Sequence, residues 1–132
     1  MDKHADIGLI GLAVMGQNLV LNMNDHGYSV AVYNRTRQKT EDFLSNGAVG
    51  RESIIGTYDI EEFVRTLKRP RKVMLMVKAG SVVDAFIDQL VGFLDAGDVI
   101  IDGGNSHFQD SERRSGELAE KGILYVGTGV SG

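Results

Sequence analysis

The stretch Ile7-Gly8-Leu9-Ile10-Gly11-Leu12-Ala13-Val14-Met15-Gly16 decides the fold of this chain. A short apolar run ends at Gly11, and the spacing Gly11-x-Ala13-x-x-Gly16 leads into a segment with apolar residues at helical intervals. This order is typical of the strand, turn and helix that bind a dinucleotide. In such a unit Gly11 makes the tight turn, Ala13 lies where the backbone approaches a pyrophosphate, and Gly16 lets the helix pack closely on the strand. The amide groups at the start of the helix then face the phosphates, where the helix dipole favours negative charge.

The composition limits the classes of protein to which the chain can belong. It has 132 residues, 42% of them hydrophobic, which suits one domain with its own core. A formal net charge of −4 argues against a general nucleic-acid-binding surface. The chain has no cysteine, which excludes disulfides, thiolate metal sites and a cysteine nucleophile. The polar start and the short apolar runs predict neither a signal peptide nor a membrane span, so we expect a cytoplasmic protein without membrane partners.

Strand and helix patterns alternate along the whole chain. The predicted strands cover residues 7–10, 29–33, 53–56, 73–77, 99–102 and 123–126. The predicted helices cover residues 15–26, 37–45, 59–67 and 107–121, with one more starting at residue 81. This alternation predicts an α/β fold with a doubly wound parallel sheet, right-handed crossovers and the strand order 3-2-1-4-5-6.

Two further patterns predict how elements in the middle of the chain are buried. The apolar run 73–77 is continuous, which indicates a strand covered on both faces. In the helix that starts at residue 81, Val82, Phe86, Leu90 and Phe93 lie at helical spacing and indicate its core face.

Asn34-Arg35-Thr36 follows the second predicted strand and indicates which coenzyme is preferred. In an NAD site an acidic residue about 20 residues past the first glycine accepts bonds from the ribose hydroxyls. No carboxylate stands here, and Arg35 can pair with a 2′-phosphate through charge-assisted hydrogen bonds. The sequence therefore predicts a preference for NADP over NAD, although a polar turn with an exposed arginine is also common.

The ends of the fourth and fifth predicted strands carry two more candidate segments, because ligands of such sheets bind at the carboxyl ends of the strands. Val77-Lys78-Ala79-Gly80 leaves room for a ribose or a nicotinamide, but it also fits a plain turn with a solvated Lys78. In Asp102-Gly103-Gly104-Asn105-Ser106, the Asn105 amide can bond a cofactor and a hydroxylated substrate. Asn105 or Ser106 can equally act as a helix N-cap, and Asp102 is expected to be structural.

Taken together, five segments resemble the 6-phosphogluconate dehydrogenase family. They match that family in order and spacing and span essentially the whole chain, at residues 10–18, 34–36, 77–80, 101–106 and 129–132. Related enzymes that act on small β-hydroxyacids share the glycine turn. Those enzymes are less similar at residues 13–14, 34–36 and 102–104.

The resemblance implies an NADP-dependent enzyme that oxidatively decarboxylates 6-phosphogluconate to ribulose 5-phosphate and acts as a homodimer. The family's cofactor-binding residues correspond to Gly11, Leu12, Ala13, Val14, Met15, Gly16, Asn34, Arg35, Thr36, Val77, Lys78, Ala79 and Asn105. The family's substrate-binding residues correspond to Asn105, Ser131 and Gly132.

The resemblance assigns no catalytic residue to this chain, because the family's catalytic lysine and glutamate lie further along. Lys78 matches the cofactor motif rather than the catalytic lysine. We therefore expect residues 1–132 to be one NADP-binding domain, cut from a longer protein before its helical second domain, that binds NADP without turnover. We expect no metal site, because the three histidines lack metal-ligand spacing. Two alternatives stay open: a related NADP-dependent β-hydroxyacid dehydrogenase and a non-catalytic dinucleotide-binding module.

Overall fold

The computed structural model describes residues 4–104 and 106–128. Strands and helices alternate in this part of the chain. Their bounds are β1 Ile7–Ile10, α1 Val14–Asp25, β2 Val30–Tyr33, α2 Arg37–Ser45, β3 Ile54–Gly56, α3 Ile60–Arg65, β4 Lys72–Leu75, α4 Ser81–Val91, β5 Val99–Asp102, α5 Phe108–Ala119 and β6 Leu124–Gly127. The predicted elements are all present, with ends that differ by a few residues.

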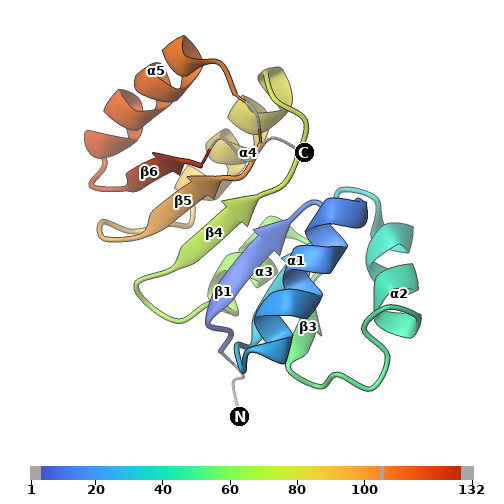
Figure 1. Cartoon of the computed structure of the whole chain (residues 1–132). Coiled ribbons are helices and arrows are strands. Elements are labelled where there is room, and N and C mark those ends of the chain that lie inside the picture. Colours follow the sequence, from blue (N-terminus) through green and yellow to red (C-terminus); the bar gives the residue numbers. More distant parts are fainter. Residues whose placement is uncertain (1–3, 105, 129–132) are drawn as a thin grey trace.

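The strands form one six-stranded parallel sheet in the order β3-β2-β1-β4-β5-β6 (Figure 1). This confirms the predicted doubly wound α/β fold and its strand order. The chain builds outward from β1 through β2 to β3, then returns to the other side of β1 for β4. The carboxyl ends of β1, β2 and β4 therefore meet where the direction of winding reverses, which is the usual place for a ligand.

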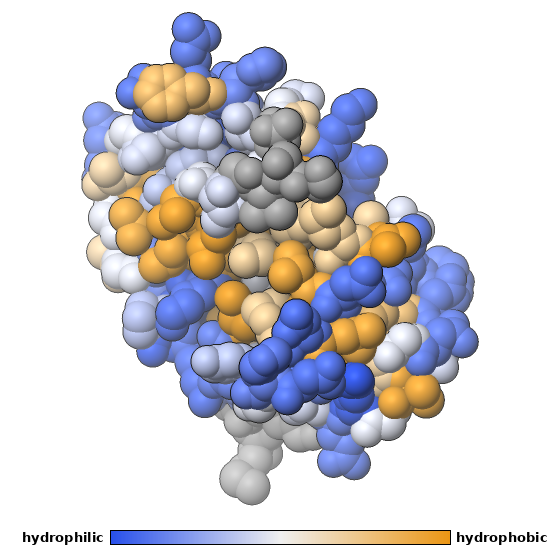
Figure 2. Space-filling model, in the orientation of Figure 1, coloured by the Kyte–Doolittle hydropathy of each residue, from blue (hydrophilic) through white to orange (hydrophobic). Residues whose placement is uncertain are grey.

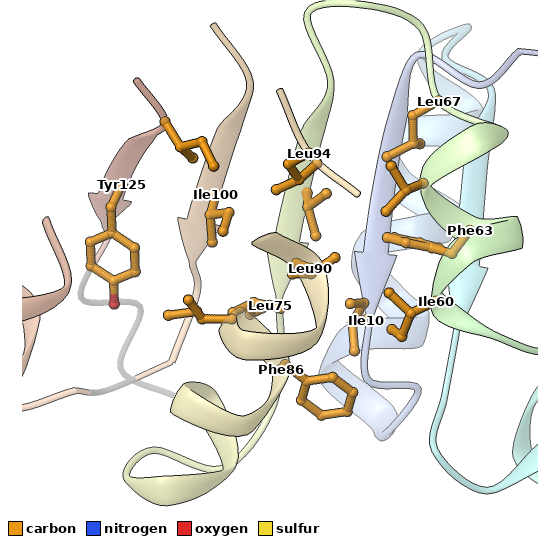
Figure 3. Close-up of a cluster of buried hydrophobic side chains, with 14 of the residues drawn as sticks. Ile10, Ile60, Phe63, Leu67, Leu75, Phe86, Leu90, Leu94, Ile100 and Tyr125 are labelled. Carbon is orange, nitrogen blue, oxygen red and sulfur yellow. The ribbon is translucent and has the colours of Figure 1, made fainter. Parts of the chain in front are cut away.

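Helices cover both faces of the sheet, but not equally. On one face, α3, α4 and α5 pack on residues from β1, β2, β4, β5 and β6 in a large apolar cluster (Figure 3). In that cluster Phe63 of α3 and Leu90 of α4 are fully buried. On the other face, α1 and α2 enclose a smaller cluster around Leu9, Val20 and Phe43. This smaller cluster lies under the β1-β2-β3 half of the sheet.

The β5-β6 edge of that second face is more open. Val99 and Ile101 of β5 are half-buried there, and Leu124 and Val126 of β6 are 59% and 39% exposed. Figure 2 shows apolar side chains gathered across this side of the molecule. The prediction that strand 73–77 is covered on both faces is therefore wrong in part. β4 ends at Leu75, and Met74 on its second face is only half-buried.

The core face of α4 differs from its predicted stripe. The buried residues are Val83, Phe86, Ile87 and Leu90, whereas Val82 is half-buried. Phe93 is 41% exposed, because α4 ends at Val91 and helical spacing stops there. None of the helices in residues 4–104 and 106–128 is long and apolar enough to cross a membrane.

Local capping explains where several helices begin and end. The Asp59 carboxylate accepts a hydrogen bond from the amide of Glu62 at 2.7 Å, and Glu62 in turn accepts from the amide of Tyr58 at 2.8 Å. This is a capping-box start of α3, with the return bond displaced by one residue. Gly27 and Gly122, at φ 95° and 76°, follow α1 and α5 in the left-handed conformation that favours glycine.

Gly16 offers a sharp test of how α1 packs on β1. A Cβ atom at Gly16 would lie 1.9 Å from the carbonyl oxygen of Gly11, which is backbone and cannot swing away. Gly16→Ala should therefore lower the free energy of unfolding by about 2 kcal/mol or more, measured by urea denaturation.

Gly116 in α5 is the matched control, because a Cβ there meets nothing within 4 Å. Gly116→Ala should raise the free energy of unfolding by about 0.5–1 kcal/mol through helix propensity alone. If both substitutions shifted stability in the same direction, the close packing of α1 on the turn would be refuted.

Candidate functional site

The glycine turn between β1 and α1 lies at the carboxyl end of β1, between the ends of β2 and β4. The Gly11 amide donates to the Tyr33 carbonyl at 3.0 Å, and the Met76 amide donates to the Ile10 carbonyl at 2.8 Å. Gly11 has φ 108°, and a Cβ there would lie 2.2 Å from the Met76 carbonyl oxygen. Only glycine fits this position without moving the backbone that follows β4.

Two polar side chains hold the next residue, Leu12, in place. Its amide donates to Oδ1 of Asn34 at 2.9 Å, and its carbonyl accepts from Nε2 of Gln17 at 2.8 Å. Nδ2 of Asn34 donates to the Thr36 carbonyl at 3.2 Å. Asn34 therefore links the glycine turn to the turn that follows β2, a structural role that its place in the sequence did not reveal.

The first turn of α1 starts without a side-chain cap. Ala13 is the N-cap residue, and among the described residues no side chain accepts a hydrogen bond from the first amide groups. The first turn also contains no acidic residue, while Val14 and Met15 are exposed. The free amides and the positive end of the helix dipole make this turn suited to an anion.

A cavity of about 260 Å³ opens beside the turn. Its lining comes from the ends of β1, β2 and β4 and from the start of α4. The described lining residues are Ile10, Gly11, Leu12, Ala13, Asn34, Arg35, Met76, Val77, Lys78, Val82 and Phe86. Arg35 and Lys78 are exposed cations, and no carboxylate is present in this described lining. The wall therefore attracts negative charge next to an uncapped helix.

The structure brings together many of the residues predicted from the sequence. Gly11, Leu12, Ala13, Asn34, Arg35, Val77 and Lys78 line the cavity. Thr36 is the exposed N-cap residue of α2, and Ala79 is half-buried after Lys78. Gly16 is buried beneath the turn, so its part is packing. The predicted positions Asn105, Ser131 and Gly132 lie outside the described residues.

The sequence did not predict the whole apolar lining of this cavity. Met76, Val82 and Phe86 face the cavity, and Phe86 also lies edge-on to Tyr33 with ring centroids 6.3 Å apart. Phe86 and Val82 belong to the predicted core stripe of α4. A helix that starts at the edge of a site serves both the core and the site, and periodicity does not separate these roles.

Asp102 at the end of β5 is structural, as expected. It is 1% exposed and accepts hydrogen bonds from the Gly104 amide at 2.9 Å, from the Ser106 hydroxyl, and from the Tyr125 hydroxyl at 2.6 Å. Ser106 is thus bonded to Asp102, and the N-cap of α5 is His107 without a side-chain cap bond. The predicted N-cap role of Ser106 is wrong, because the buried carboxylate takes its hydroxyl. Burial and the hydrogen bond to Asp102 raise the pKa of the Tyr125 phenol.

Arg114 is the buried residue that sequence reasoning overlooked. It is 2% exposed and lies on α5, which reads as a polar helix. Its guanidinium pairs with Asp84 of α4, Nε to Oδ1 at 2.8 Å and Nη2 to Oδ2 at 3.2 Å. The hydrogen bonds from Arg114 hold the pKa of the Asp84 carboxyl below its ordinary value, against the opposing effect of burial. Arg114 and Leu118 are four residues apart and both are buried. This spacing is the pattern in the sequence that indicates a buried face of α5.

Residues 4–104 and 106–128 contain no cluster of three or more His, Cys, Asp or Glu side chains arranged to hold a metal ion.

Comparison with known proteins agrees with this geometry. A family profile described as the NAD binding domain of 6-phosphogluconate dehydrogenase matches residues 6–132. The chain belongs to this family. A decarboxylating 6-phosphogluconate dehydrogenase from Cunninghamella elegans is 68% identical over 97% of the chain, and one from Saccharomyces cerevisiae is 66% identical over 97%.

A solved structure of Plasmodium falciparum 6-phosphogluconate dehydrogenase superimposes with a TM-score of 0.84 at 46% identity over 91% of the chain. That enzyme is described in its apo form, with its cofactor NADP+ and with its substrate 6-phosphogluconate. The chain spans 26% of the length of each of these three dehydrogenases, so it corresponds to about a quarter of such an enzyme.

Asn34 gives a test of how the two turns of the 6-phosphogluconate dehydrogenase domain are joined. Asn34→Ala removes the acceptor of the Leu12 amide and should lower the free energy of unfolding by about 1–2 kcal/mol in urea denaturation. Asn34→Asp keeps an acceptor at the same place and should lose less than half of that amount. Equal losses for the two variants would show that the bond to Leu12 does not support the turn.

Proposed function

We propose that residues 1–132 form the NADP-binding domain of a longer, decarboxylating 6-phosphogluconate dehydrogenase. The observation that carries this proposal is the position of Arg35 on the wall of a cavity that adjoins the glycine turn and whose described lining has no carboxylate. Family membership over residues 6–132 supports the same conclusion.

The residues present fit an NADP molecule. The turn at residues 11–16 would hold its pyrophosphate through the uncapped amides at the start of α1, because an unpaired helix start favours anions. Arg35, with Asn34 and Thr36, would hold the 2′-phosphate. Val77, Lys78, Ala79 and Asn105 would lie along the rest of the coenzyme. When bound, NADP+ supplies the acceptor for the hydride that leaves the substrate.

Arg35 would provide the discrimination between NADP and NAD. Its guanidinium can donate two hydrogen bonds to a phosphate, whereas a ribose hydroxyl offers it no charge. Arg35 is exposed, so its side chain can reach a phosphate at the mouth of the cavity. Lys78, which also lines the cavity, adds a second positive charge that favours the coenzyme's phosphates.

The full-length enzyme would complete the site with chain beyond residue 132. We propose that it acts on 6-phosphogluconate as a cytoplasmic homodimer, with Asn105, Ser131 and Gly132 contacting the substrate and the catalytic lysine and glutamate in a helical second domain. Exposed Leu124 and Val126 on the open face of β6 support further chain packing there. On this proposal, residues 1–132 bind NADP and do not turn over substrate by themselves.

Arg35→Ala in the full-length enzyme tests the central assignment. Its affinity for NADP+ should fall by about 10- to 100-fold, because one charged hydrogen-bonding group at the 2′-phosphate is lost. Its affinity for NAD+ should stay within about twofold of the wild-type value. Isothermal titration calorimetry with both coenzymes measures the difference.

Arg37→Ala is the matched control, because Arg37 is also exposed but pairs with Glu41 at 3.1 Å and stacks 4.1 Å over the Tyr58 ring. It should leave both affinities unchanged. An Arg35 variant that kept the wild-type ratio of NADP+ to NAD+ affinity would refute the assignment.

A further inference from the structure

Arg114 joins two loops that follow neighbouring strands at the coenzyme side of the sheet. Nη2 donates to the Gly80 carbonyl at 3.1 Å, where the turn after β4 enters α4. Nη1 donates to the Ser106 hydroxyl at 3.3 Å, in the loop after β5. The same guanidinium also binds Asp84 through two hydrogen bonds. One buried side chain therefore holds three elements at fixed relative positions.

The loop after β5 is tied to Arg114 a second time through Asp102. Asp102 accepts from the Ser106 hydroxyl and from the Gly104 amide, and its Oδ2 lies 3.8 Å from Nη1 of Arg114. These contacts fix Gly104 and Ser106, the residues on either side of Asn105. Buried charged groups thus fix the geometry of the loop after β5.

Packing between α4 and α5 does not by itself require an arginine at position 114. The side chain of Arg114 is 1% exposed, and removing a guanidinium from water carries a large desolvation cost before its partners compensate. A buried apolar residue between α4 and α5 would avoid that cost. What an arginine adds is a planar fork of donors that fixes several acceptors at once, which an ammonium group does not reproduce.

The two loops held by Arg114 border the half of the sheet that receives the second nucleotide of a dinucleotide. In doubly wound folds the coenzyme crosses the point where the strand order reverses, with one nucleotide on each half. The turn after β2, which carries Arg35, lies on the other half and has none of the hydrogen bonds described for Arg114.

We propose that Arg114 is a positioning residue of the coenzyme site: it locks the loops after β4 and β5 together and so sets how the nicotinamide end of NADP+ lies. This inference rests on the proposed function. The inference extends the proposed function by dividing the coenzyme site into two ends. The adenosine end is fixed by the glycine turn and Arg35, and the nicotinamide end is fixed through Arg114.

Arg114→Lys in the full-length enzyme tests the inference, because a lysine keeps the charge but cannot reach Asp84, Gly80 and Ser106 together. Its kcat should fall by about 10- to 100-fold, as expected when a reacting group is displaced by about 1 Å. Its affinity for 2′,5′-ADP, which has no nicotinamide, should change by less than about twofold. Rates are normalised to the number of 2′,5′-ADP sites found by calorimetry, so that loss of folded protein does not count as loss of kcat.

Arg113→Lys is the control on the same helix. Arg113 also donates to Asp84, at 3.1 Å, but it is 44% exposed, and no hydrogen bond to Gly80 or Ser106 is found for it among the described residues. The kcat of Arg113→Lys and its affinity for 2′,5′-ADP should match those of the wild type. Ser106→Ala is the milder second variant in case Arg114→Lys does not fold, and it should lower kcat by about 3- to 10-fold.

The inference would be overturned if Arg114→Lys behaved like Arg113→Lys, or if 2′,5′-ADP affinity fell in proportion to kcat, which would indicate a general structural role. A folded Ser106→Ala enzyme with wild-type kcat would count against it in the same way. A wild-type enzyme that bound neither NADP+ nor 2′,5′-ADP would refute the proposed function itself, and with it the role of Arg114.

Discussion

The close approach of Gly16 to the carbonyl oxygen of Gly11 is the constraint on which the coenzyme side of the domain depends. A Cβ at Gly16 would lie 1.9 Å from that oxygen, so α1 rests directly on the turn that precedes it. With α1 this close, its first amides point into the space at the end of β1. Gly11 in turn lies against the backbone at Met76, which couples the turn to the end of β4. Backbone packing thus sets how closely α1 and the end of β4 approach the glycine turn.

The two ends of the site are held by different kinds of interaction. Around the glycine turn, neutral hydrogen bonds satisfy the backbone of Leu12, whose amide donates to Asn34 and whose carbonyl accepts from Gln17. Around the loops after β4 and β5, the buried Arg114 holds the structure through ionic contacts with the half-buried Asp84 and the buried Asp102. A charged network fixes directions more strictly than apolar packing, but it is tolerated only while every partner is present. The loops after β4 and β5 are therefore held by charged groups, whereas the glycine turn is held by backbone packing and neutral hydrogen bonds.

The sequence was enough to predict the sheet, its order and most of the cavity wall. Apolar periodicity and glycine positions are local signals, and the handedness of crossovers limits the remaining topologies. It was not enough for residues whose role depends on distant partners. Asn34 meets Leu12 across 22 residues, and Arg114 meets Asp84 across 30. Phe93 was misplaced because α4 ends two residues before it, and helix ends are set by local geometry that spacing does not reveal.

The net charge of the chain says little about this site, because the local arrangement of charge runs against it. The chain carries −4 overall, yet the cavity places Arg35 and Lys78 beside uncapped amides with no carboxylate in its described lining. Two carboxylates near the neighbouring loops have other roles. Asp84 neutralises the buried Arg114, and Asp102 orders the loop after β5. Because Arg35 and Lys78 are exposed, their field is screened within about 8 Å at physiological salt. Their attraction therefore acts at the mouth of the cavity, whereas the amides of the turn act at contact distance, so the two kinds of attraction for an anion are separable.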